Sequence, residues 1–245
     1  IIDGSSNLDK MLKIFNDKYE EEDEDAGQMN YVDIEHLVFN NVGVAIDGPN
    51  KKGITLKDNV FVNGKYTSEA GMESYIEVKN SKNYVIENNV FLRGEQYPGL
   101  GIVTYGTKNT TIKNNFFGNL DGINDAKKMI PEIALKLSLM NTSDLIEGEQ
   151  GNFFTAISNE RYDTNILIQK NYFNLMKTSN VLSDVASDHI IHSKGYDNLQ
   201  IVGNYFKGQE NGAAGGVKIR NGKNAYIGAN YFDDVPLLTY IYPDL

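Results

Sequence analysis

The chain of 245 residues contains no cysteine and no tryptophan, and it has few prolines and only three histidines. The absence of cysteine excludes disulfides and thiolate metal sites, and three histidines (His36, His189 and His192) leave little for a histidine-based metal centre. No apolar run approaches the roughly 18 residues that a membrane helix needs. The chain also begins at Ile1 without a signal peptide, so we interpret it as a mature fragment or a recombinant domain.

Positive charge is also scarce, with 23 lysines and arginines against 33 aspartates and glutamates, a formal net charge of -10. This balance argues against a nucleic-acid partner, whose phosphates need a basic surface. An acidic glycan remains compatible, because a few clustered cations make a local positive site on an acidic protein. Hydrophobic residues make up 40% of the chain, which is enough for a sizeable buried core.

A four-point motif, Asn-x-x-Ile-x-x-Asn-x-Phe, is the strongest signal in the sequence. Five intact copies begin at Asn83, Asn109, Asn165, Asn198 and Asn224, and partial copies end at Phe39 and Phe61. The units between copies contain short runs of alternating apolar and polar residues, such as 75–79 and 217–220, which are typical of strands. Repeated strand-rich units of this length predict an all-β chain folded as a single right-handed parallel β-helix.

The motif residues themselves have a structural explanation. Inward isoleucines and phenylalanines would stack from coil to coil. Asparagine tolerates left-handed backbone conformations at corners, and stacked side-chain amides can bond to one another. We therefore expect the motif to build the fold and not to carry chemistry.

Two segments interrupt the repeat. Residues 7–29 begin with a helix-like spacing of Leu8, Met11, Leu12 and Phe15 and then become a charge run over 20–25. We expect a helical N-terminal cap and an acidic loop over residues 1–29, with calcium binding there as an alternative, and the β-helix domain over 30–245. Residues 118–160 contain insertions around 121–129 and 141–151, which we expect to wall a binding cleft.

The repeat allows positions to be compared between coils. The residue ten before the second motif asparagine is, in turn, Lys79, Tyr105, Arg161, Lys194 and Arg220. Adjacent coils lie about 4.8 Å apart, so Lys194 and Arg220 should be direct neighbours. Because successive side chains of a strand point to opposite faces, His192 and Lys218 should lie on the same outer face as Lys194 and Arg220. Two stacked cations suggest a bridging anion, although two solvated side chains whose ends splay apart are an equal alternative.

These residues carry a family resemblance. The stretches 191–198, 203–206, 219–222 and 229–232, with 31–39 and 84–91 upstream, resemble polysaccharide lyase family six, which includes chondroitinase B and alginate lyases. In that family a Ser/Asn-Lys-Ser motif precedes an Arg-His-Gly motif by one coil; here Ser193-Lys194-Gly195 precedes Arg220-Asn221-Gly222. The resemblance implies a pectate-lyase-like solenoid that cleaves uronate polymers by β-elimination. It implies Lys194 as the base and Arg220 as the group assisting the leaving oxygen.

The sequence departs from the family pattern at the calcium site. His189 stands where the resemblance would require a glutamate, and Asn221 stands where the family has histidine. We therefore expect no metal and no other cofactor, with Lys136, Arg161 and Lys218 as candidate replacements for the calcium charge. The residues expected to contact the polymer are His192, Lys218, Arg161, Lys136, His189, Tyr105 and Lys79.

Two functions follow as hypotheses. The first is a calcium-independent lyase that acts on alginate, a pectin-like polymer or a glycosaminoglycan such as chondroitin. The second is a non-catalytic glycan-binding β-helix of a bacterial surface adhesin or phage tail protein. Both imply an acidic polysaccharide as the partner and a secreted, periplasmic or cell-surface location; the oligomeric state stays open.

Overall fold

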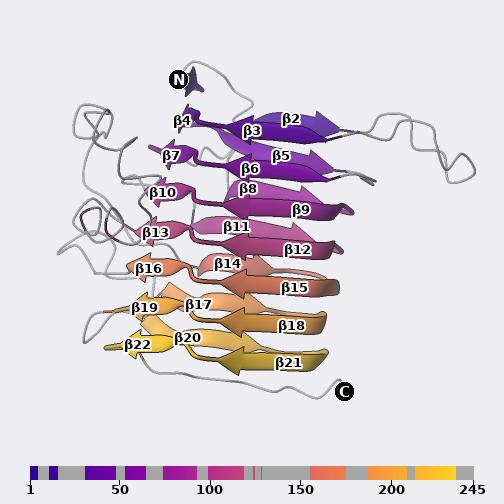
Figure 1. Ribbon diagram of the computed structural model, residues 1–245, viewed down its shortest axis with the longest axis vertical. Helices are drawn as coiled ribbons and strands as arrows, with labels where there is room; N and C mark the ends of the chain where they lie inside the picture. Colours follow the sequence, from indigo (N-terminus) through magenta and orange to yellow (C-terminus); the bar gives the residue numbers. More distant parts are fainter. Residues whose placement is uncertain are drawn as a thin grey trace, which may run out of the picture.

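Three parallel β-sheets wind around a common axis in the computed structural model, and their strands stack in successive coils (Figure 1). The structure describes residues 1–4, 11–15, 31–47, 53–64, 74–92, 99–118, 155–174, 187–208 and 213–235, together with Asn124 and Lys128. Each complete coil contributes one strand to each of the three sheets, which we call sheets I, II and III. The predicted all-β parallel β-helix is confirmed.

The strands of each sheet follow one another in chain order. Sheet I contains β1 (Ile2–Asp3), β4 (Val38–Asn40), β7 (Val60–Val62), β10 (Val90–Leu92), β13 (Phe116–Gly118), β16 (Tyr172–Asn174), β19 (Tyr205–Lys207) and β22 (Tyr231–Asp233). Sheet II contains β2 (Met11–Phe15), β5 (Gly43–Asp47), β8 (Ser74–Lys79), β11 (Leu100–Tyr105), β14 (Thr155–Asn159), β17 (Ser187–Ser193) and β20 (Ala213–Ile219). Sheet III contains β3 (Val32–Glu35), β6 (Ile54–Lys57), β9 (Lys82–Glu87), β12 (Lys108–Lys113), β15 (Asp163–Gln169), β18 (Tyr196–Val202) and β21 (Gly222–Gly228).

The second motif asparagine forms a buried ladder at the corner between sheets III and I. The backbone N–H and Nδ2 of Asn115 both donate to Oδ1 of Asn171, each at 3.0 Å, and Nδ2 also donates to the carbonyl of Ile86 at 2.9 Å. Asn89 makes the same bonds to Oδ1 of Asn115. The residue before each ladder position takes a positive φ, as at Asn114 (53°), which asparagine tolerates. The predicted amide ladder is confirmed.

The first motif asparagine forms a second, exposed ladder at the start of sheet III. Asn109 has φ 57° and donates from Nδ2 to Oδ1 of Asn83 at 2.8 Å. Asn165 and Asn198 continue the row with bonds of 2.9 and 3.0 Å. Asn224 leaves it and donates to Asp197 instead.

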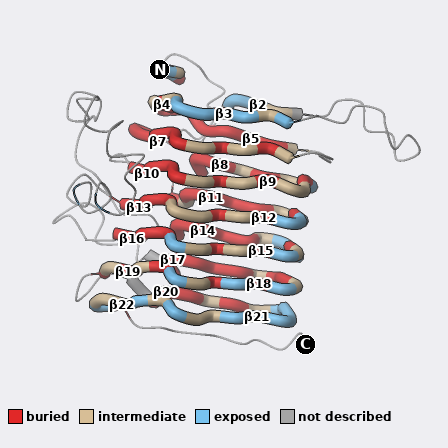
Figure 2. The backbone as a smooth tube through the Cα atoms, in the orientation of Figure 1, coloured by how far each residue is buried: buried red, intermediate tan, exposed pale blue. Residues whose placement is uncertain are grey.

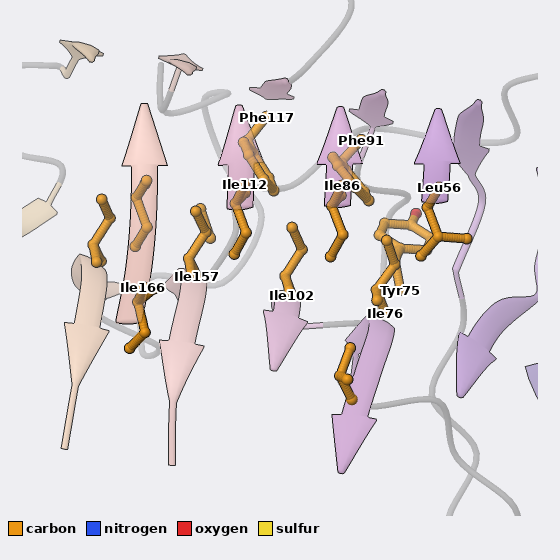
Figure 3. Close-up of a cluster of buried hydrophobic side chains, with 14 of the residues drawn as sticks. Leu56, Tyr75, Ile76, Ile86, Phe91, Ile102, Ile112, Phe117, Ile157 and Ile166 are labelled. Atoms are coloured by element: carbon orange, nitrogen blue, oxygen red, sulfur yellow. The ribbon is translucent and has the colours of Figure 1, made fainter. Parts of the chain in front are cut away.

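Aromatic rings form a continuous stack inside the solenoid. Neighbouring rings lie 4.6–5.1 Å apart along the series Phe39, Phe61, Phe91, Phe117, Phe173, Phe206 and Phe232. Figure 3 shows Phe91 and Phe117 beside isoleucines such as Ile86 and Ile112, which face each other in register. The core is therefore one long column, and each coil buries its apolar face against the next.

The N-terminal segment differs from the prediction. Residues Met11–Phe15 form strand β2, which pairs in parallel with β5, and β1 pairs with β4. The expected helix is therefore wrong over 11–15, and these strands belong to the solenoid and not to a separate cap. A run of five residues is too short for apolar spacing to distinguish helix from strand, and pairing with the β5 edge decides. The acidic run at 20–25 lies outside the described residues.

Strand β21 of the last coil is the most exposed strand of sheet III. Figure 2 shows β21 largely exposed, whereas the central strands of sheets I and II are buried. No helix in the described part of the chain is long and apolar enough to cross a membrane.

Candidate functional site

Two rows of side chains run along the outer face of sheet II, parallel to the solenoid axis. The first row contains Ala45, Glu77, Val103, Ser158, His192 and Lys218. The second contains Asp47, Lys79, Tyr105, Glu160, Lys194 and Arg220. The strands that carry the C-terminal part of both rows, β14, β17 and β20, lie next to one another in Figure 1.

Lys194 and Arg220 are register neighbours, as the spacing predicted. Ser193 pairs with Ile219, and the backbone N–H of Arg220 donates to the carbonyl of Ser193 at 2.9 Å. Lys194 and Arg220, which directly follow Ser193 and Ile219, therefore lie side by side. Ile191 and Val217 are fully buried on the opposite side of the strands, which confirms the predicted alternation.

Arg161 is not in the second row, and this prediction was wrong. Thr104 pairs with Asn159, and the backbone N–H of Glu160 donates to the carbonyl of Thr104 at 2.8 Å. Glu160 therefore occupies the position next to Tyr105. The corner that follows contains one extra residue, because Lys108 pairs with Thr164. A count of ten residues back from Asn171 reaches Arg161, but the insertion shifts the position to Glu160. The predicted cation is therefore a carboxylate.

Glu160 forms an ion pair with Lys194. The Lys194 ammonium donates to one carboxylate oxygen of Glu160, and Ser158 Oγ donates to the other at 2.6 Å. Partial burial alone would raise the pKa of Glu160, but the hydrogen bonds from Lys194 and Ser158 and the lysine charge lower it overall. In this structure Lys194 is therefore held in a salt bridge, whereas a general base needs a free, neutral amine.

Lys79 and Tyr105 lie farther toward the N-terminal end of the same row. Lys79 Nζ is 2.6 Å from the carboxylate of Glu77 and 5.3 Å from the centroid of the Tyr105 ring. Glu77 therefore offsets the lysine charge within the rows. This end of the face also contains Asp47, next to Lys79.

The two histidines predicted to contact the polymer are buried. His189 is 3% exposed and His192 5% exposed, and their ring centroids are 6.4 Å apart. Alternation places His189 on the same side of β17 as the core residue Ile191. Neither ring presents a surface to a polymer in this structure. Lys136 lies outside the described residues.

Cations collect at the C-terminal end of the two rows. Over the last three coils, the charged residues that the structure describes in the two rows are Lys194, Lys218 and Arg220, together with Glu160, which pairs with Lys194. Arg220 Nε is buried and has no hydrogen-bond partner in the described part of the chain. The rows therefore change from acidic at the Asp47 end to basic at the Arg220 end, on a protein of net charge -10.

A buried carboxylate lies at the corner behind Glu160. Asp163 is fully buried and accepts hydrogen bonds from Thr104 Oγ1 at 2.5 Å, from the Thr107 backbone N–H at 2.5 Å and from Thr107 Oγ1 at 3.0 Å. Burial raises the pKa of Asp163, although these bonds oppose the shift. Neither Glu160 nor Asp163 was predicted from the sequence. The available signal was the corner from Asn159 to Thr164, which is one residue longer than the corner from Thr104 to Lys108.

The described residues contain no group of three histidine, aspartate or glutamate side chains placed to hold a metal ion. Residues 129–136, which include the candidate cation Lys136, lie outside them. The expectation of a cofactor-free site stays a prediction.

Comparisons with known proteins give two similar structures. A pectate lyase from Bacillus sp. N165, solved in complex with trigalacturonate, is 14% identical over 86% of this chain and 85% of that chain, with a TM-score of 0.32. PfbA, a surface adhesin of Streptococcus pneumoniae, is 10% identical over 86% of this chain and 84% of that chain, with a TM-score of 0.26. No protein-family model and no curated protein matches. Similarities this distant assign no activity, and the resemblance to polysaccharide lyase family six stays a prediction.

Proposed function

We propose that this protein binds an acidic, uronate-containing polysaccharide along the outer face of sheet II, at its C-terminal end. The observation that carries the proposal is the cluster of Lys194, Lys218 and Arg220 on two adjacent coils. Such a cluster on a protein of net charge -10 is stabilised when an anion lies between the cations.

The geometry of the rows favours a linear polymer. Coils repeat about every 4.8 Å, so equivalent side chains form a straight array along the axis. A chain of uronates presents carboxylates at regular intervals and can meet successive coils. Arg220 suits a carboxylate because its guanidinium donates two parallel hydrogen bonds.

Binding is tested with uronate polymers and a neutral glucan immobilised on a surface. We expect retention on the uronate polymers only, and a fall in affinity of about tenfold or more in a Lys218→Ala/Arg220→Ala variant, since each charged contact contributes about 1.5–3 kcal/mol. Lys113→Ala is the matched control, because Lys113 lies on sheet III in an ion pair with Glu87. Equal retention of the double variant would refute the proposed face.

β-Elimination is a second candidate, favoured by the register of Lys194 beside Arg220. Turnover would need Lys194 to release its proton and leave Glu160 when substrate binds. Lys194→Arg distinguishes binding from catalysis, because arginine keeps the charge but does not act as a base. If the protein is a lyase, wild type produces unsaturated sugar ends detected by ultraviolet absorbance, and Lys194→Arg still binds but produces none. Absence of product on every uronate polymer bound by wild type would exclude the lyase.

A further inference from the structure

The corner between β14 and β15 is bulged. Lys108 follows Thr104 by four positions at the preceding corner, but their register partners Asn159 and Thr164 are five positions apart. An inserted residue in a β-structure displaces its neighbours outward and re-aims their side chains. Here the displaced residues are Arg161 and Tyr162, both exposed.

A buried carboxylate anchors this bulge. Asp163 ends the bulge and is bound to Thr104 and Thr107 of the preceding coil. The equivalent positions of the neighbouring coils carry uncharged residues: Ser81, Thr107, Tyr196 and Gly222. Burying a carboxylate is unfavourable unless several donors satisfy it. Among the coils from β9 to β21, the carboxylate thus occurs at the corner that contains the insertion, and it holds the bulge against the coil behind it.

The bulge adds one exposed cation, Arg161, at the corner next to the basic end of the rows. Glu160, the partner of Lys194, is its first residue. The bulge packs against the next coil, because a Cβ added to Gly195 would lie 3.4 Å from the Tyr162 backbone. Tyr162 is 51% exposed.

We propose that this bulge is a sugar subsite, in which the Tyr162 ring packs against the apolar face of a pyranose and Arg161 binds a carboxylate of the same polymer. The inference rests on the proposed function, since it extends the same basic face by one corner. Tyrosine suits this role because it combines a rigid apolar ring with a polar tip. An aromatic ring on the coil next to Lys194 would add shape recognition to a surface of charged side chains.

The test compares Tyr162→Ala, Tyr162→Phe and Tyr226→Ala in titrations with a uronate oligosaccharide at several salt concentrations. Tyr226 is the control, because it is exposed to a similar extent but lies on sheet III. We expect Tyr162→Ala to weaken binding about fivefold, and Tyr162→Phe and Tyr226→Ala to bind within about twofold of wild type. The salt dependence should be unchanged in Tyr162→Ala and reduced in Arg161→Ala, because only the arginine contributes charge.

The outcomes separate this inference from the proposed function. If wild type binds, Lys218→Ala/Arg220→Ala weakens binding and Tyr162→Ala does not, the subsite is refuted and the basic face stands. If wild type binds no uronate oligosaccharide, both are refuted. Far-ultraviolet circular dichroism and thermal midpoints of each variant must match wild type, and since Tyr162 is exposed we expect them to do so.

Discussion

At the scale of single residues, the buried asparagine ladder shows how one side chain connects three coils. Asn115 accepts from the backbone N–H and Nδ2 of Asn89, and it donates to Asn171 and to the carbonyl of Ile86. All of these groups are buried, so they have no access to water when the side chain is removed. The same residue therefore satisfies polar backbone that the corner would otherwise leave unpaired.

We predict that Asn115→Ala lowers the free energy of unfolding by about 3 kcal/mol or more, because it leaves several buried polar groups unpaired at about 1–3 kcal/mol each. Asn109→Gly is the control, since it removes an amide from the exposed ladder while glycine accepts the positive φ. Urea denaturation of both variants checks the contrast. Equal destabilisation by the two changes would contradict the structural role given to the buried ladder.

The raised pKa of Asp163 means that its contribution to the free energy of unfolding falls as pH rises. Its folded-state pKa is raised by burial, so its stabilising contribution is fully present below the unfolded pKa of about 3.9 and is lost as pH rises through the folded value. An asparagine at this position would mimic the protonated acid at every pH. We therefore predict that Asp163→Asn becomes more stable relative to wild type as pH rises from about 4 toward 7. Urea midpoints measured across this range test the prediction, and parallel curves for the two proteins would refute it.

At the scale of strands, close contact between coils restricts side-chain size. A Cβ on Gly101 in β11 would lie 2.5 Å from the carbonyl oxygen of Ala156 and 2.9 Å from the Phe117 ring. Both neighbours belong to the packed solenoid and have little room to move.

We predict that Gly101→Ala lowers the free energy of unfolding by about 1–3 kcal/mol, as overpacking does. Gly195→Ala should be far milder, because its new Cβ would meet its neighbours at ordinary contact distances of 3.4 Å or more. Thermal midpoints provide the comparison. A Gly101→Ala protein as stable as Gly195→Ala would show that the strands can separate more than the structure indicates.

The strands also show what the sequence could and could not predict. The Asn and Phe repeat predicted the solenoid, and it predicted the adjacency of Lys194 and Arg220 because each lies ten residues before its motif asparagine. The strand β2 was missed because its apolar spacing fits either a helix or a strand over five residues. Glu160 was missed because a single inserted residue shifts the register. Its pairing with Lys194, 34 residues away, is a tertiary contact that no local pattern reports.

At the scale of the whole molecule, charge is distributed unevenly along the solenoid. The outer rows of sheet II begin with Asp47 and Glu77 and end with Lys218 and Arg220. The basic end is small compared with the net charge of -10, so the proposed polymer binding cannot depend on long-range attraction. It would depend on close contacts, for which the rows offer side chains on adjacent coils.

The most direct test is the salt dependence of affinity for a uronate oligosaccharide, measured by titration calorimetry for wild type, Lys218→Ala/Arg220→Ala and the control Lys113→Ala. We predict that wild type and the control weaken together as salt rises, because screening acts on the contacts between cations and carboxylates. The double variant should bind more weakly at low salt and respond less to added salt. A double variant with the affinity and salt dependence of wild type would contradict the claim that this face binds the polysaccharide.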